Sequence, residues 1–205
     1  MFERYAVPYF EAGQRVLEIG PDGTPSRFQR LVHVPLDWAT ADLRTEVDEH
    51  GERLWGGGRG DELTLVMPGP YEIPAEDSTF DVVVSGQVIE HVREPWRWMA
   101  EVGRVCRPGG LIITVNPVSW PYHEAPVDCW RIYPEGMRAL CESVGFGVET
   151  TRWESLEPRP RRWYPGPSAD QDLGRRGRAV NRLRALVGWP LPIAFDTLTV
   201  ARKPS

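Results

Sequence analysis

Residues able to bind a polar substrate and move a proton are concentrated between positions 116 and 134, which read N-P-V-S-W-P-Y-H-E-A-P-V-D-C-W-R-I-Y-P. His123 titrates near neutrality, so we expect it to act as a general base if an alcohol has to lose a proton. Asp128 could hold the tautomer of that imidazole. Substrate contacts are expected from the neighbouring aromatic and basic side chains, namely Trp120, Tyr122, Trp130, Arg131 and Tyr133. A well-packed loop with an internal Asp128–Arg131 pair is the alternative.

A second group of candidate residues follows the apolar run at residues 15–19, in the sequence V-L-E-I-G-P-D-G. A strand that ends in glycines lets the backbone approach a bound cofactor closely, which points to Gly20 and Gly23. Glu18 could accept hydrogen bonds from a cationic ligand. Asp22 could either cap the next helix or contact that ligand. Taken alone, the segment is equally consistent with an ordinary strand and turn.

A carboxylate about twenty residues after the first acidic residue is typical of sites that bind a nucleoside ribose. Asp37 has this spacing from Glu18, and we expect it to end a second strand over residues 31–36. The alternative is a helix cap or a turn residue, in which case Asp42 is the next candidate for the ribose.

The elements that must position these residues alternate between apolar runs and helical patterns. Strands are expected over residues 15–19, 31–36, 63–67, 80–85, 111–116, 146–151 and 196–202, and helices over 2–12, 96–106, 134–144 and 173–187. The central strands are apolar throughout, so they should be buried on both faces. This order predicts a single-domain, Rossmann-like α/β fold with a mostly parallel seven-stranded sheet and helices on both faces.

Composition limits the kind of protein and its partners. The 205 residues favour one domain: an N-terminal helix (1–13), a cofactor-binding core (14–150), a lid or insertion (152–190) and a closing strand (191–205). A net charge of -5 argues against nucleic acid, and the chain has no apolar run long enough to span a membrane. Three cysteines without a CxxC pair predict no metal site and a reduced, cytoplasmic setting.

Two longer blocks complete the pattern. Residues 73–92 read I-P-A-E-D-S-T-F-D-V-V-V-S-G-Q-V-I-E-H-V, and residues 104–116 read R-V-C-R-P-G-G-L-I-I-T-V-N. In this order and at these spacings, the motifs resemble the class I S-adenosylmethionine-dependent methyltransferases, and within them the group with a Glu-His pair after the fourth strand. The resemblance covers roughly residues 14–150 and the final strand.

The resemblance implies S-adenosylmethionine as the cofactor and assigns a part of it to each motif. The glycine motif would cradle the methionine part, the acid after the second strand would hold the ribose, and the turn after the third strand would lie against the adenine. The matching residues are Glu18, Gly20 and Gly23, then Asp37, then Pro70 and Tyr71, with Ser85, Gly86 and Gln87 near the sulfonium. His91 would lie close to the cleft as a rival base. Asp22 departs from the family pattern, which often has glycine there.

The expected function is methyl transfer to a hydroxyl or amine of a small molecule such as a sugar or natural-product intermediate, by a monomer or homodimer. A nicotinamide-dependent oxidoreductase is a weaker alternative, because the chain lacks a clean G-x-G-x-x-G motif and a Tyr-x-x-x-Lys pair. A non-catalytic, cofactor-binding partner subunit is the third possibility. An arginine-rich stretch over residues 152–184 is either a solvated face or a cationic rim that favours an anionic acceptor.

Overall fold

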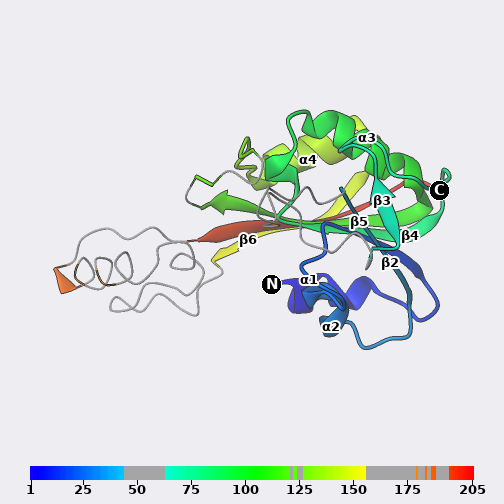
Figure 1. Cartoon of the computed structure of the whole chain (residues 1–205), viewed down its shortest axis with the longest axis horizontal. Coiled ribbons are helices and arrows are strands. Elements are labelled where there is room, and N and C mark those ends of the chain that lie inside the picture. The colour runs from blue at the N-terminus through cyan, green and yellow to red at the C-terminus, as the bar shows by residue number, and fades with distance from the viewer. Residues whose placement is uncertain are drawn as a thin grey trace, which may run out of the picture.

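Seven strands form one sheet in the order β3-β2-β1-β4-β5-β7-β6 (Figure 1). The computed structural model describes residues 1–43, 63–120, 122–123, 127–155, 179, 183, 186–187 and 194–205. Strands β1 to β5 run parallel, and β7 is antiparallel to both β5 and β6. The strands are β1 (Arg15–Ile19), β2 (Asp37–Leu43), β3 (Leu65–Met67), β4 (Phe80–Gly86), β5 (Cys106–Ser119), β6 (Gly147–Ser155) and β7 (Phe195–Arg202). This architecture confirms the predicted fold class.

Helices cover both faces of the sheet and bury its apolar side chains (Figure 1). One face carries α1 (Phe2–Tyr5), the 3-10 turn η1 (Val7–Tyr9) and α2 (Arg27–Leu31), and the other carries α3 (Pro95–Val105) and α4 (Pro134–Ser143). A second 3-10 turn, η2 (Ile89–His91), follows β4. The three consecutive valines of β4, Val82, Val83 and Val84, are all buried, as expected for a parallel strand covered on both faces.

Helix α3 connects the two long sequence blocks. Its apolar residues recur at helical spacing and face the core, while Arg104 on another side reaches the loop before β4. The guanidinium of Arg104 donates to the main-chain carbonyls of Ile73 (2.9 Å) and Ala75 (2.8 Å). Glu101 accepts from both Arg104 (2.7 Å) and the amide of Ile73 (2.7 Å). Arg104, at the start of the block 104–116, therefore holds the main chain of the block 73–92.

The second strand lies elsewhere than predicted. Residue 31 ends α2, and the strand runs over residues 37–43 instead of 31–36. The side chain of Ser26 caps α2 by accepting from the amide of Gln29 at 3.0 Å, and this helix includes Leu31, the residue at which the strand was expected to begin. The true strand reads D-W-A-T-A-D-L, whose small and polar residues give a weak apolar signal.

The N-terminal region is also less regular than the predicted helix over residues 2–12. Helix α1 ends at Tyr5, and η1 follows with Pro8 inside it, a residue that has no amide to continue a helix. Most of the predicted lid over residues 152–190 and of the helix over 173–187 lies outside the described residues. Within the latter, Ala179, Leu183 and Leu186 are helical. No helix in the described part of the chain is both long and apolar enough to cross a membrane.

Candidate active site

A cavity of about 720 Å³ opens at the carboxyl ends of the first four strands. The last residue of each strand lines it: Ile19, Leu43, Met67 and Gly86. Open α/β sheets place their ligands at this edge. Carboxylic acids and apolar side chains share the wall, including Glu18, Asp22, Asp42, Phe28 and Tyr71. The cavity therefore offers acidic groups to a cationic or hydroxyl-bearing ligand and apolar surface to a flat ring.

The loop after β1 is fixed by close packing at Gly20. This residue has a φ of +71°, and a Cβ atom added there would lie 2.3 Å from Cγ2 of Val88. Both the backbone conformation and the contact therefore require glycine. Gly23 is different, since it does not line the cavity and its nearest neighbour to an added Cβ would be 3.9 Å away.

Glu18 is buried at the wall of the cavity, with only 2% of its surface exposed. Its Oε2 accepts hydrogen bonds from the hydroxyl of Ser26 (2.5 Å) and the indole N–H of Trp38 (2.9 Å). Burial raises the pKa of Glu18, and these two hydrogen bonds act in the opposite direction. The carboxyl group is thus held in one orientation by side chains from two neighbouring elements.

Asp22 performs the capping role that the sequence left open. Its Oδ1 accepts from the amide of Arg27, the first residue of α2, at 2.7 Å, and its Oδ2 lies 3.3 Å from the Nε of Arg27. Because Asp22 also lines the cavity, the contact to α2 does not remove it from the ligand site.

Asp42, and not Asp37, lies at the cavity end of the second strand. Asp37 begins β2 and therefore lies at the amino end of the strand, opposite the cavity. There it pairs with Arg15 at 3.3 Å with 72% of its side chain exposed. Asp42 is the penultimate residue of β2 and lines the cavity. The expectation that Asp37 ends a strand is wrong, because the strand starts where it was predicted to stop.

The turn after β4 positions Gly86 and Gln87. A Cβ atom at Gly86 would lie 2.5 Å from the ring of Phe28, so glycine lets this aromatic ring pack onto the end of the strand. Gln87 has a φ of +57°, lines the cavity and donates from its side-chain amide to Oδ2 of Asp196 at 2.8 Å. Ser85 is buried in β4 and does not line the cavity.

Pro70 and Tyr71, after β3, line the cavity as expected. The hydroxyl of Tyr71 accepts from the amide of Glu94 at 3.1 Å, and the guanidinium of Arg97 lies 4.4 Å from the centre of its ring. The aromatic ring is thereby attached to the start of α3.

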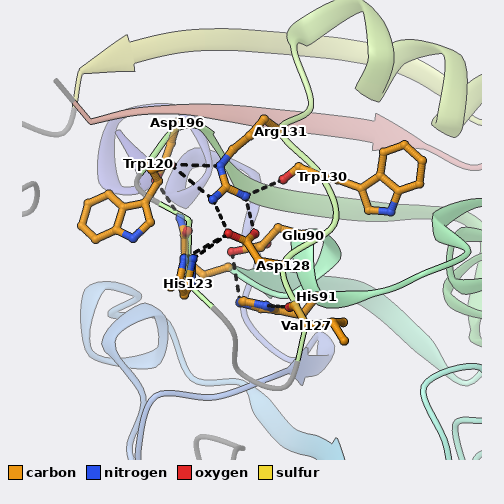
Figure 2. Close-up of polar contacts among 10 residues, drawn as sticks. Glu90, His91, Trp120, His123, Val127, Asp128, Trp130, Arg131 and Asp196 are labelled. Carbon is orange, nitrogen blue, oxygen red and sulfur yellow. Dashed lines mark hydrogen bonds and ion pairs between the residues drawn. The ribbon is translucent and has the colours of Figure 1, made fainter. Parts of the chain in front are cut away.

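The imidazoles of His91 and His123 lie close together (Figure 2). Nδ1 of His91 lies 2.5 Å from the carbonyl oxygen of Val127, which can only accept, so Nδ1 carries the hydrogen and Nε2 keeps its lone pair. Burial lowers the pKa of His91. His91 lines the cavity, whereas His123 does not; the centres of the two rings are 5.1 Å apart.

Asp128 joins His123 to Arg131 (Figure 2). Its side chain is 1% exposed, and it accepts two hydrogen bonds from the guanidinium of Arg131, at 2.5 and 2.6 Å. Oδ2 also accepts from the amide of His123 at 2.9 Å and lies 3.4 Å from its Nδ1. Burial alone would raise the pKa of Asp128, but these hydrogen bonds outweigh it and lower the pKa. The internal pair left open by the sequence is therefore formed.

The residues expected to contact substrate are divided between internal contacts and the surface. Arg131 also donates to the main-chain carbonyls of Trp120 (3.3 Å) and Trp130 (2.8 Å), and the indole N–H of Trp130 donates to the carbonyl of Val92 at 2.8 Å. Tyr122 and Tyr133 are 71% and 61% exposed. None of the five lines the cavity.

Sequence reasoning missed several residues of the site. Glu90 was given no role of its own in the sequence analysis, where it appeared only in the Glu-His pair. Its side chain is nevertheless only 1% exposed and lies beside His91. Burial raises the pKa of Asp196 to about 6, and nothing near it in the sequence indicates that it meets Gln87. Other cavity residues without an earlier assignment are Ile19, Pro21, Arg27, Phe28, Leu43, Met67, Val88, Val92, Arg93, Trp98 and Val127. Ile19, Pro21, Met67 and Val88 lie at or just after the end of a predicted strand, and the sequence held no comparable signal for the others.

Comparison with known proteins finds relatives among methyltransferases. Residues 39–114 match the family described as Methyltransferase domain. A probable S-adenosylmethionine-dependent methyltransferase of Mycolicibacterium smegmatis is 36% identical over 86 residues, or 39% of this chain and 34% of the relative. An uncharacterized methyltransferase of Mycobacterium sp. (strain JLS) is 49% identical over 102 residues, or 49% of this chain and 38% of the relative.

The matched regions thus span less than half of the length of these curated relatives. Among solved structures, a SAM-dependent methyltransferase from Archaeoglobus fulgidus superposes with a TM-score of 0.58 at 16% identity, covering 98% of this chain and 91% of that one. The strand-end cavity, the sheet order and these relatives agree with the resemblance seen in the motifs. Over residues 39–114 the chain is similar to methyltransferase domains, and the relatives that match it include proteins named S-adenosylmethionine-dependent methyltransferases.

Proposed function

We propose that this protein transfers a methyl group from S-adenosylmethionine to a hydroxyl or amine of a small molecule, such as a sugar or natural-product intermediate. The observation that carries the proposal is the cavity itself, whose lining includes three acids, Glu18, Asp22 and Asp42, and the imidazole of His91, whose pKa is lowered by burial. A cofactor that carries an ammonium, a sulfonium and ribose hydroxyls is complementary to such a wall.

The residues present fit this cofactor. Glu18 and Asp22 would face its cationic methionine part, and Asp42 takes the ribose role first expected for Asp37. Leu43, Met67 and Tyr71 offer apolar contact for the adenine. When bound, the cofactor supplies an electrophilic methyl group on a sulfonium sulfur. The protein's part is to align an acceptor atom with that methyl and to take up the acceptor's proton.

Two imidazoles are candidates for the base. His91 lines the cavity, its tautomer is fixed by Val127, and its lowered pKa keeps it uncharged at neutral pH. These observations move our proposal from His123 to His91 for the proton-accepting role. His123, oriented by Asp128 and in contact with the ring of His91, remains the second candidate and could pass the proton onward.

Binding of the demethylated product, S-adenosylhomocysteine, tests the cofactor half of the proposal. Calorimetry on the folded protein should show saturable heat with S-adenosylhomocysteine and none with NAD. An absence of heat with both would reject the cofactor site. Transfer of labelled methyl from S-adenosylmethionine to a panel of small hydroxyl and amine compounds then tests the acceptor half.

A further inference from the structure

The carboxyl group of Glu90 is buried beside the two imidazoles. It is 1% exposed, and its Oε2 has no hydrogen-bond partner among the residues that the structure describes. Oε1 lies 3.7 Å from Nε2 of His91, which is beyond hydrogen-bonding distance. An ionised carboxylate with so few partners is costly to bury, whereas a neutral carboxylic acid carries no charge.

Burial is the main reason why Glu90 favours its neutral form. Asp128 and Arg131 face it from the segment 127–133, and Asp196 faces it from β7. The guanidinium of Arg131 is already engaged by both carboxylate oxygens of Asp128. Burial and repulsion from the two aspartates outweigh the hydrogen bond from the main chain of Glu90 and the charge of Arg131, and raise the pKa of Glu90 to about 8, so that it is protonated at neutral pH.

The main chain of Glu90 holds the segment opposite. Its carbonyl oxygen accepts from the amides of Cys129 (2.7 Å) and Trp130 (3.3 Å). The carbonyl of Val127, in the same segment, accepts from Nδ1 of His91. The residue before His91 therefore anchors the segment that fixes the tautomer of His91.

We propose that Glu90 is a positioning residue for His91: its neutral carboxylic acid leaves the adjoining imidazole uncharged, and its main-chain carbonyl holds the segment that fixes the imidazole tautomer. An anionic Glu90 would instead favour the imidazolium and remove the base before reaction.

The catalytic consequence rests on the proposed function. As the acceptor oxygen or nitrogen forms its bond to the methyl carbon, the electron pair of the broken carbon–sulfur bond goes to sulfur. The acceptor's proton moves to Nε2 of His91, so the positive charge lost at sulfur appears on the imidazole. A neutral Glu90 leaves Nε2 able to accept that proton.

Nuclear magnetic resonance of the full chain without cofactor tests the charge state directly. The probes are the side-chain carboxyl carbon of Glu90 and the ring nitrogens of His91, in the wild type and in Glu90→Gln, whose amide is neutral and similar in shape. Glu76→Gln is the matched control, because Glu76 is an exposed glutamate. We expect one carboxyl resonance that titrates near pH 8 and disappears in Glu90→Gln, with the pKa and Nδ1–H tautomer of His91 unchanged. A Glu90 resonance that titrates near the ordinary value, or a fall in the pKa of His91 in Glu90→Gln, would overturn the proposal.

Thermal unfolding provides a second measurement. The pKa of Glu90 is raised above its unfolded value of 4.5, so the wild type loses stability as the pH rises from there through about 8. Glu90→Gln lacks this loss. Its Tm relative to wild type should therefore increase with pH and level off above about pH 8, while Glu76→Gln stays level. A pH-independent difference for Glu90→Gln contradicts the proposal.

These outcomes are separate from the proposed function. Failure to bind S-adenosylhomocysteine would reject the cofactor and leave the titration of Glu90 intact. An ordinary Glu90 titration in a protein that binds S-adenosylhomocysteine would reject the positioning role alone. If Glu90→Gln does not fold, the carboxyl titration of the wild type still decides the question.

Discussion

Two parts of the candidate site are positioned by different kinds of contact. At the cavity wall, Gly20 and Gly86 place the chain against Val88 and Phe28, with no room for a Cβ atom. Beside the cavity, the segment 127–133, of which Val127 lines the cavity, is held by the buried carboxylate of Asp128 and its hydrogen bonds. The cavity wall should therefore be sensitive to added volume, and the segment 127–133 to lost charge.

Gly20→Ala is expected to have the largest effect. The positive φ and the 2.3 Å approach to Val88 should together cost about 2 to 4 kcal/mol of the free energy of unfolding. Binding of S-adenosylhomocysteine should fall with it, because the loop would have to move. Urea unfolding and calorimetry measure the two effects. Gly23→Ala is the control, expected within about 0.5 kcal/mol of wild type; an equal loss there would show that tight packing at Gly20 is not the cause.

Asp128→Ala tests how strongly the buried carboxylate holds the segment 127–133. Removing the carboxylate leaves the partly buried guanidinium of Arg131, 24% exposed, without its main partner. Breaking a buried pair costs about 3 to 5 kcal/mol, and partial exposure should reduce this to about 2 to 3 kcal/mol. Urea unfolding measures the loss. Asp77→Ala removes an ion pair to Arg104 in which the aspartate is 77% exposed, and should cost about 0.5 kcal/mol or less. If the two variants lose the same stability, burial does not strengthen the Asp128 pair.

The cavity wall around Glu18 and Gly20 was predictable from sequence to a greater extent than the contacts of residues 120–133, for a physical reason. Glu18 and Gly20 lie within three residues of each other at the end of a strongly apolar strand, so pattern and position agree. β2 has no such apolar run, and it begins six residues later than predicted. The ribose role was therefore assigned to Asp37, which begins the strand, instead of Asp42 near its end.

Several contacts around the site join residues far apart in the chain. Trp130 binds the carbonyl of Val92, 38 positions away, and Gln87 binds Asp196, 109 positions away. The local sequence showed that Trp130 and Arg131 are able to bind a ligand. It could not show that their donors are used inside the protein, because the partners are brought together only by the folded sheet.

Replacement of each imidazole tests which of the two acts as the base in the proposed reaction. His91→Ala should lower kcat by about 100-fold, the effect typical of a lost general base, with affinity for S-adenosylhomocysteine preserved. Burial lowers the pKa of His91, so the acidic limb of the wild-type rate profile should lie below the ordinary histidine value of 6.5.

His123→Ala is the matched variant for this comparison, since its ring touches that of His91 but does not line the cavity. We expect His123→Ala to lose less kcat than His91→Ala and to keep the acidic limb of the wild-type pH–rate profile. If His123→Ala instead loses the larger part of the activity, the base is His123, and Asp128 orients it as the sequence first suggested.

The smallest expected effect is a loss of affinity for S-adenosylhomocysteine, which distinguishes Asp42 from Asp37 as the residue that would bind the ribose. Asp42 lies at the cavity, where its Oδ1 accepts from the amide of Leu43 at 2.7 Å, so part of its orientation is set before any ligand binds. Asp42→Ala should remove a charge-assisted hydrogen bond worth about 1.5 kcal/mol, which is roughly a tenfold loss of affinity for S-adenosylhomocysteine. Asp37→Ala removes the same group at the opposite end of β2 and should leave affinity unchanged, because its ion pair with Arg15 is exposed. Calorimetry on both variants decides between them. A loss of affinity in Asp37→Ala alone would mean that the ligand does not bind at the carboxyl end of β2. A loss of affinity in Asp42→Ala alone would identify Asp42, the second candidate from the sequence, as the ribose ligand.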